Sequence, residues 1–136
     1  MRHLAQRVGV FVDVQNMYYS ARALYDQRVD FGEILKEASS GRQLVRAMAY
    51  CIKAGKEDEQ TFFDALRDRG YELRMKDLLT YYGGNSKGDW DVGIAIDIVG
   101  MLSKLDVVVL VSGDGDFVEL LKYVKVHGCR AEVMAF

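Results

Sequence analysis

Two short apolar runs, residues 8–12 and 107–111, constrain the fold of this 136-residue chain more than any other feature. Valine fills most of both runs, and neither contains a polar side chain. A strand that is apolar on both faces must be covered on both sides, as in the parallel sheets of α/β proteins. Helix-like segments alternate with strand-like segments along the chain, which is the pattern of βαβ crossovers. We therefore predict an α/β fold with a mainly parallel central sheet.

The other segments are assigned from their periodicity and their start and stop signals. Asp30 followed by Glu33 is a capping-box pattern that predicts a helix start, and Gly41 is a helix stop. Residues 78–87 are expected to be irregular. We predict one domain over residues 1–136, with strands at 8–12, 43–52, 71–77, 106–111 and 129–134, and helices at 16–27, 30–39, 56–69, 89–104 and 114–127.

Composition narrows the class of protein. Hydrophobic residues make up 50% and charged residues 28% of the chain, as in ordinary globular domains. No apolar run is long enough to span a membrane, and we expect a cytoplasmic protein. Cys51 and Cys129 form no CxxC pair and are expected to be buried, reduced thiols. The absence of GxGxxG, Walker A and GxSxG motifs argues against a nucleotide cofactor and against serine hydrolysis.

Acidic side chains follow both apolar runs, at the point where each strand should end. Asp13 comes directly after the first run, and Ser112-Gly113-Asp114-Gly115-Asp116 follows the second. The carboxyl ends of parallel strands meet at one edge of a sheet, where such sheets bind ligands. One carboxylate there could cap a helix. Several carboxylates repel each other unless a cation such as Mg²⁺ lies between them, so the sequence predicts a metal site.

A third acidic segment, from Lys87 to Asp97, supplies further candidates. Asp91 lies in the first turn of the expected helix, and Asp97 follows about 120° further around the helix axis. We expect Asp91 to face the acidic site. Asp97 lies among apolar residues, so we expect it to be partly buried and either to hydrogen-bond Lys87 or backbone, or to reach the site itself. Gly93 and Gly100 predict close packing of this helix on the sheet.

The chain resembles the NYN domain of LabA-like proteins, a branch of the PIN-like nuclease superfamily, over essentially its whole length. The motifs that carry the resemblance are Val10-Phe11-Val12-Asp13-Val14-Gln15-Asn16, Lys87-Gly88-Asp89-Trp90-Asp91-Val92 with Asp97, and Val111-Ser112-Gly113-Asp114-Gly115-Asp116-Phe117. The resemblance implies a three-layer α/β/α sandwich. It also implies a ribonuclease-type site that uses Mg²⁺ or Mn²⁺.

The matching positions give each candidate residue an expected role. The resemblance implies that the catalytic and metal-binding carboxylates are Asp13, Asp91, Asp114 and Asp116, with Asp97 as a further candidate ligand. Asn16 is suited to contacts with phosphate or with metal-bound water. Ser112 could orient Asp114 or bind phosphate, and Lys87 could neutralise phosphate charge. Exposed aromatic side chains stack on unpaired bases in proteins that bind single strands. Tyr81, Tyr82 and Trp90 are the better candidates for this role, ahead of Tyr18 and Tyr19, and packing is the alternative for all of them.

Three functions remain open on the sequence alone. The leading one is a metal-dependent ribonuclease that acts on single-stranded RNA. The second is a non-catalytic regulatory or RNA-binding module that keeps the fold, and a homodimer is compatible with either. The third is a phosphatase-like hydrolase, which is disfavoured because the residues after Asp13 do not form a DxDxT/V motif. The complete set of acids favours catalysis over a binding module.

Overall fold

The computed structural model describes residues 4–80, 86–87 and 90–136, and for residues 79, 80, 86 and 87 it describes the backbone alone. Within these ranges every predicted element is present, with boundaries shifted by a few residues. The strands of the main sheet are β1 (Arg7–Asp13), β2 (Gln43–Lys53), β3 (Glu72–Asp77), β6 (Val107–Val111) and β7 (Arg130–Met134). The α-helices are α1 (Val14–Tyr25), α2 (Phe31–Ser39), α3 (Glu59–Asp68), α4 (Asp91–Met101) and α5 (Val118–Val126), and 3₁₀ turns lie at Leu102–Lys104 and Gly115–Phe117.

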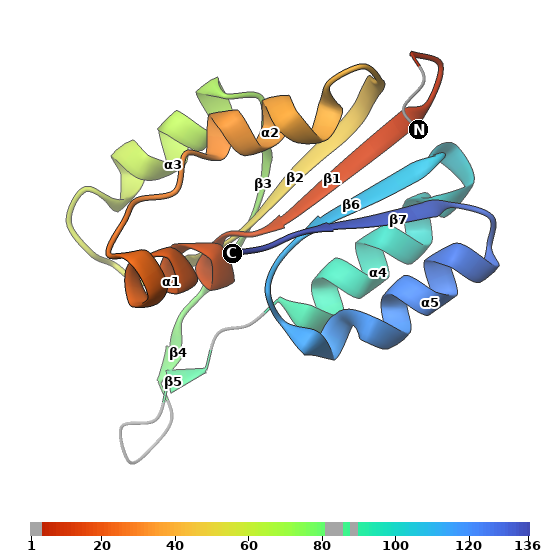
Figure 1. The fold of residues 1–136 in the computed structure, drawn as a ribbon. Helices are drawn as coiled ribbons and strands as arrows, with labels where there is room; N and C mark the ends of the chain where they lie inside the picture. The colour runs from red at the N-terminus through yellow and green to blue at the C-terminus, as the bar shows by residue number, and fades with distance from the viewer. Residues whose placement is uncertain (1–3, 81–85, 88–89) are drawn as a thin grey trace.

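The five strands form one sheet in the order β3-β2-β1-β6-β7, and every pairing in it is parallel. Helices α2 and α3 cover one face of the sheet, helices α4 and α5 cover the other, and α1 crosses near the carboxyl ends of the strands (Figure 1). The predicted α/β class and the three-layer arrangement are confirmed.

The segment expected to be irregular contains a short antiparallel pairing, between β4 (Leu79–Thr80) and β5 (Ser86–Lys87). This corrects the prediction for residues 78–87. Two-residue strands are too short to leave an alternating pattern in the sequence, so periodicity could not reveal them.

The central strands β1 and β6 supply both hydrophobic cores. β6 is buried at all five positions, and β1 is buried everywhere except at its first residue. Successive side chains of a strand point to opposite faces. Val8, Val10 and Val12 therefore pack with residues of α1, α2 and α3, whereas Phe11 packs with residues of α4 and α5. Burial on both faces is the property that the two apolar runs predicted.

Two aspartates fix the starts of the first two helices. The Asp30 carboxylate accepts a hydrogen bond from the Glu33 amide at 3.0 Å, as the capping pattern predicted. Asp13 does the same for α1, accepting from the Asn16 amide at 3.2 Å. Because Asp13 is both the last residue of β1 and this cap, α1 begins at Val14, two positions before the predicted start.

Both cysteines are buried and unpaired, which confirms the prediction of reduced thiols. Burial raises the pKa of the Cys51 thiol to about 12, so this group stays protonated and unreactive near neutral pH. Among the residues that the structure describes, no helix combines the length and the apolar character needed to cross a membrane.

The two glycines of α4 have different surroundings. A Cβ atom at Gly93 would lie 2.5 Å from Cε3 of Trp90, whereas a Cβ atom at Gly100 would meet nothing within 4 Å. Gly93 is closely packed, but against the Trp90 indole of its own segment and not against the sheet as predicted. The expectation of close packing is wrong at Gly100, which lies on the exposed side of the helix.

We predict opposite effects of alanine at these two positions. Gly93→Ala should destabilise the protein by about 1–3 kcal/mol, because the buried indole must shift. Gly100→Ala should stabilise it by up to about 1 kcal/mol, because alanine loses less backbone entropy in a helix and meets no obstacle. Equilibrium unfolding in urea measures both changes. Equal effects of the two substitutions would contradict this account of α4.

Candidate metal centre

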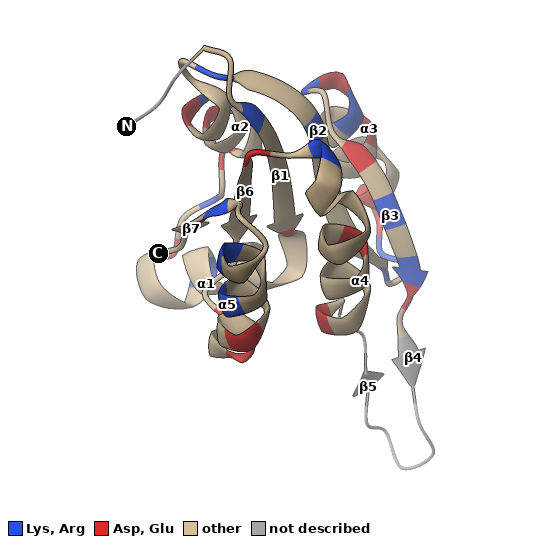
Figure 2. Ribbon diagram, turned by 90° about the vertical axis from the view of Figure 1, so that its right-hand side faces the viewer, with Lys and Arg blue, Asp and Glu red and all other residues tan. Residues whose placement is uncertain are grey.

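The parallel pairing of β1 with β6 brings the two acidic motifs together. Val12 is opposite Val111 in this ladder, so Asp13 and Ser112 leave the sheet side by side. We call the edge where the strands finish the carboxyl edge. Helices α4 and α5 begin at the same edge, where the charge-coloured view shows acidic segments at the starts of both (Figure 2). Asp13 and the loop that carries Asp114 therefore share one end of the sheet, as predicted.

Three carboxylates converge at this edge. Asp91, Asp114 and Asp116 each offer an oxygen atom, and these three atoms lie within 4.8 Å of one another. We call this group the acidic triad. Asp91 and Asp114 are half-buried and Asp116 is exposed. Two like charges about 4 Å apart near a protein surface repel by roughly 4 kcal/mol, so the triad favours a counter-ion.

The chemistry of the triad suits a hard divalent cation. Carboxylate oxygens are the ligands that Mg²⁺ prefers, and Mg²⁺ usually takes only a few protein ligands and keeps several waters. The partial exposure of the triad leaves room for those waters. The described part of the chain places no histidine or cysteine in the group, which argues against a zinc site.

The loop after β6 is held in place by short-range hydrogen bonds. The Asp114 amide donates to Oγ of Ser112 at 3.2 Å, and the Asp116 amide donates to Oδ1 of Asp114 at 2.9 Å. Ser112 is itself buried, with 2% of its surface exposed. These bonds fix the direction of the Asp114 carboxylate. The role of Ser112 here is to accept a hydrogen bond from the Asp114 amide and so to hold the loop.

Asn16 ties this loop to α1. Its side-chain Oδ1 atom accepts a hydrogen bond from the Gly113 backbone amide at 2.8 Å, and its backbone amide donates to the Asp13 carboxylate. Asp13 is 7% exposed and caps α1, and its carboxylate is outside the group of three. Asp13 and Asn16 thus lie at the predicted edge, and their hydrogen bonds connect the end of β1 to the loop after β6.

Trp90 anchors the start of α4 and so positions Asp91. Its side chain is 5% exposed, and its Nε1 donates to the carbonyl oxygen of Cys51 at 2.8 Å. The Lys76 ammonium lies 4.3 Å from the centre of the indole, a cation–π contact. Of the two alternatives open for Trp90, packing is the correct one, because its ring is buried against β2 and beside Lys76.

Asp97 is engaged elsewhere on α4. Its carboxylate accepts from the Tyr50 hydroxyl at 2.8 Å and pairs with the Arg74 guanidinium at 2.6 Å. Partial burial is confirmed, since 13% of the side chain is exposed. Within the described residues the partners of this carboxylate are Tyr50 and Arg74, and the side chain of Lys87 lies outside them. Burial, and then the hydrogen bond to Asp97, raise the pKa of Tyr50, which keeps this hydroxyl a proton donor. Asp97 is not part of the acidic triad.

Sequence reasoning missed Tyr50 and Arg74 as partners of this carboxylate. The two residues are opposite each other in the β2–β3 ladder, and no sequence motif reveals that pairing. The alternation of β2 does place Tyr50 on the side of the sheet that α4 covers. Tyr81 and Tyr82 lie outside the described residues. Lys87 belongs to β5, and its side chain lies outside the described part of the chain.

Comparisons with known proteins give one family model and two similar proteins. The family model described as "NYN domain" matches residues 7–136. The chain is similar to the low amplitude and bright protein LabA of Synechococcus elongatus, at 31% identity over 89% of this chain and 70% of LabA. It is also similar to the crystal structure of a protein of unknown function from Vibrio parahaemolyticus, with a TM-score of 0.89 and 32% identity over 99% of this chain and 84% of that one.

We predict that divalent cations raise the melting temperature of this protein. A ligand that binds only the native state at a hundred times its Kd stabilises it by about 2.7 kcal/mol. Asp114→Asn should remove most of that gain, and it should raise the stability of the metal-free protein because one like charge is lost. Asparagine keeps an oxygen that can accept from the Asp116 amide, so the loop should survive the change.

Differential scanning calorimetry with Mg²⁺, Mn²⁺ or EDTA measures these shifts. Glu119→Gln is the matched control, because Glu119 lies in the first turn of α5, five residues after Asp114, with 85% of its side chain exposed, and among the described contacts it pairs with Lys122. An unchanged melting temperature of the wild type at millimolar metal would show that the triad binds no cation.

Proposed function

The chain belongs to the NYN domain family, and we propose that it is a metal-dependent ribonuclease that hydrolyses phosphodiester bonds of single-stranded RNA. The observation that carries the proposal is the convergence of Asp91, Asp114 and Asp116 at the carboxyl edge of a parallel sheet. Structural aspartates need no such convergence, because each could cap its own helix from a separate position.

The acidic triad would hold Mg²⁺ or Mn²⁺ through its carboxylate oxygens. Such a cation, when bound, withdraws electron density from a phosphate oxygen and lowers the pKa of water. In hydrolysis the oxygen of water adds to phosphorus, one ester P–O bond breaks, and the products are a phosphate monoester and an alcohol. The role of the protein is to hold phosphate and water in line and to keep the acidic loop rigid.

The residues around the triad supply that rigidity in our proposal. Ser112 and Asn16 keep the loop after β6 against α1 through their hydrogen bonds to the Asp114 and Gly113 amides. Asp13 is proposed as a fourth acid that supports the site through Asn16, with Asp97 holding α4 against β3.

Three residues enter the proposal on the sequence alone. Lys87 is proposed to neutralise phosphate charge. Tyr81 and Tyr82 are proposed to stack on unpaired bases. All three lie in the segment between β3 and α4, which reaches the triad at Asp91.

Purified protein should cleave single-stranded RNA in Mn²⁺ or Mg²⁺ and lose that activity in EDTA. Asp114→Asn and Asp91→Asn should each lower the cleavage rate by orders of magnitude, because each removes a carboxylate from the triad. Asp13→Asn should lower it as well. A gel assay on matched single- and double-stranded RNA and DNA measures the rates.

Glu119→Gln should cleave at the wild-type rate, which controls for a general effect of losing a carboxylate on α5. Equal cleavage by wild type and Asp114→Asn would point to a contaminating nuclease. If metal binding is established and the wild type cleaves none of the substrates, the ribonuclease proposal fails and a binding module takes its place.

A further inference from the structure

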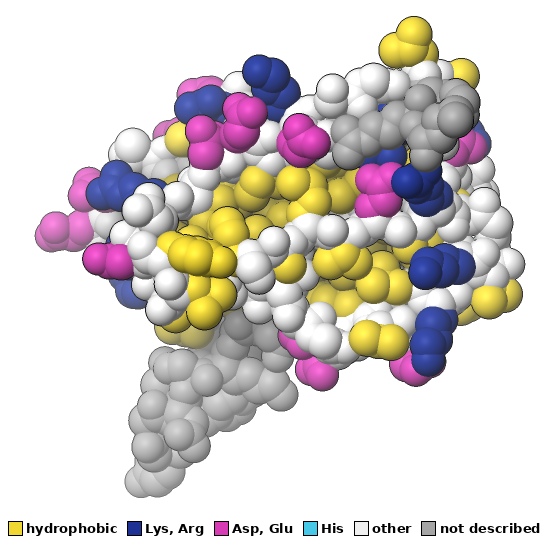
Figure 3. Space-filling view, viewed as in Figure 1, with side chains coloured by type: hydrophobic (Ala, Val, Ile, Leu, Met, Phe, Trp, Pro, Cys, Tyr) yellow, Lys and Arg dark blue, Asp and Glu magenta, His cyan; other side chains and the backbone are white. Residues whose placement is uncertain are grey.

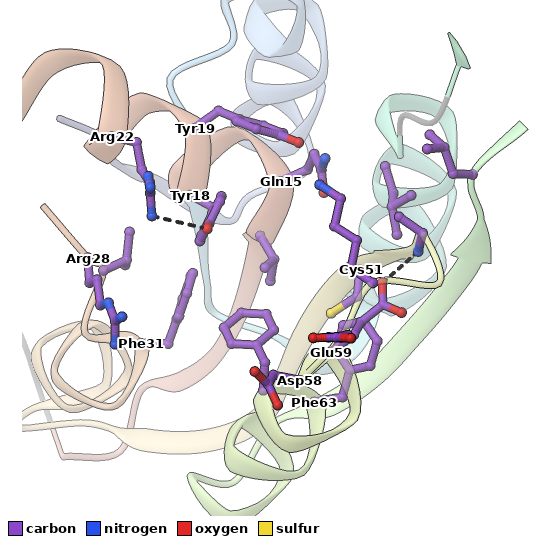
Figure 4. Close-up of a pocket in the computed structure, with 18 residues that line it drawn as sticks. Gln15, Tyr18, Tyr19, Arg22, Arg28, Phe31, Cys51, Asp58, Glu59 and Phe63 are labelled. Atoms are coloured by element: carbon purple, nitrogen blue, oxygen red, sulfur yellow. Dashed lines mark hydrogen bonds between the residues drawn. The ribbon is translucent and has the colours of Figure 1, made fainter. Parts of the chain in front are cut away.

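A large cleft opens at the carboxyl ends of β1 and β2. Its volume is about 860 Å³, within the range of pockets that hold small organic ligands. Tyr18 and Tyr19 extend from α1 on one side, and Asp58, Glu59 and Phe63 come from α3 and its start on the other (Figure 4). We call this space the α1 cleft. None of the residues assigned above to the triad or its supports lines it.

The floor of the α1 cleft is apolar and uncharged. In the view of Figure 3, hydrophobic side chains gather over the middle of the molecule and charged side chains lie mostly around its periphery. The Cys51 thiol belongs to the floor, and its raised pKa keeps it neutral. A flat, neutral ring system fits such a surface. The other floor residues are Val14, Phe31, Ile52, Phe62 and Phe63.

Two adjacent tyrosines form the α1 wall. Tyr18 is 38% exposed, and Arg22 holds it through a hydrogen bond to its hydroxyl at 3.4 Å and a cation–π contact at 5.7 Å. Tyr19 is 51% exposed and meets Tyr18 edge-on, with the ring centres 5.6 Å apart. Tyr19 therefore presents an open aromatic face beside an apolar floor, which is the arrangement of a base-stacking platform.

Charge is divided between the two sides of the cleft. Arg22 and Arg28 lie on the α1–α2 side, and Asp58 and Glu59 lie on the α3 side (Figure 4). The Glu59 carboxylate accepts from the Ala54 and Gly55 amides, at 2.6 and 3.1 Å, so it is committed to its own loop. A phosphate group would be attracted to the arginine side and repelled by the acidic side. The remaining charged lining residues are Lys56 and Glu57.

The cleft and the triad are close enough to share one nucleic-acid strand. The cleft lies over the ends of β1 and β2, and Asp114 follows β6 on the other side of β1. Two strand spacings separate β2 from β6, which is roughly 10 Å. Gln15 of the cleft directly precedes Asn16, which contacts the acidic loop. A neighbouring nucleotide of a strand held at the triad can therefore reach the cleft.

We propose that the α1 cleft binds the unpaired base of a nucleotide next to the phosphate held at the acidic triad. Tyr19 stacks on the base over the apolar floor, and Arg28 pairs with the phosphate on the open side. The inference rests on the proposed function, since it takes single-stranded RNA as the substrate. Because the cleft lies between α1 and α3, we expect it to exclude a base that is still paired with a second strand and so to select for unpaired RNA.

Binding of a fluorescein-labelled, unstructured single-stranded RNA tests this, measured by anisotropy in Mg²⁺. All variants are made in the protein with its acidic triad intact, called the background protein, so that a cation can hold the phosphate. A denaturing gel of each sample checks that the RNA is still intact when the anisotropy is read. Tyr19→Ala should weaken binding about tenfold, the usual effect of removing one stacking ring. Tyr19→Phe should bind as the background protein does. Arg28→Ala should weaken binding. It should also reduce the slope of the logarithm of the binding constant against the logarithm of the salt concentration by about one, because one counter-ion fewer is released.

Two substitutions outside the cleft are matched controls. Tyr25→Ala removes a tyrosine of α1 that is 58% exposed, and Arg67→Ala removes an arginine of α3 that pairs with Asp64. Both should leave Kd within about twofold, as ordinary surface changes do. Unchanged binding in Tyr19→Ala, an equal loss in Tyr25→Ala, or absence of RNA binding by the background protein would overturn the proposal.

Cleavage by the wild type, assayed separately, distinguishes the two proposals. If Tyr19→Ala weakens RNA binding but the wild type cleaves no RNA, the α1 cleft stands and the ribonuclease function fails. If the wild type cleaves RNA while Tyr19→Ala binds as tightly as its background, the function stands and the cleft assignment fails.

Discussion

The parallel pairing of β1 with β6 is the constraint on which the candidate site depends. Both strands are buried on both faces, so they can lie only at the centre of a covered sheet, and their ladder sets Val12 opposite Val111. A shift of one residue in a strand would turn every side chain to the other face and exchange the two cores. The register that satisfies both cores also delivers Asp13 and the Asp114 loop to the same place.

Electrostatic repulsion at that place has to be offset by the rest of the structure. Three carboxylates whose oxygens lie within 4.8 Å of each other would separate if their backbones were free to move. Hydrogen bonds from the Asp114 and Asp116 amides hold the loop, and the buried indole of Trp90 holds the first turn of α4. The protein thus keeps an unfavourable arrangement of charge, and a bound cation would turn it into a favourable one.

The parts of the fold that could be predicted are those that local patterns encode. Apolar runs identified β1 and β6, a capping pattern identified α2, and the acids after the runs identified the carboxyl edge. The 3.6-residue repeat of the helix also predicted that Asp91 and Asp97 point in different directions, and the two carboxylates do have different partners. Each of these inferences needs only neighbours along the chain and the geometry of one element.

The remaining features depend on contacts between distant segments. The sequence left stacking and packing both open for Trp90, and only its contacts with β2 and β3 show that it packs. The pairing of Asp97 with Tyr50 and Arg74 requires the β2–β3 register. The α1 cleft draws on α1, the start of α2, the end of β2 and α3, and no motif joins those segments. In each case the sequence supplied the residue types, and tertiary packing decided their surroundings.

The central claim, that the acidic triad holds a divalent cation, can be tested most directly by anomalous X-ray diffraction from crystals soaked in Mn²⁺. The account predicts one anomalous peak within coordination distance of the carboxylates of Asp91, Asp114 and Asp116, and no peak there in Asp114→Asn crystals. Saturated crystals of the wild-type protein with no peak at the triad, or with manganese bound only at other carboxylates, would contradict it.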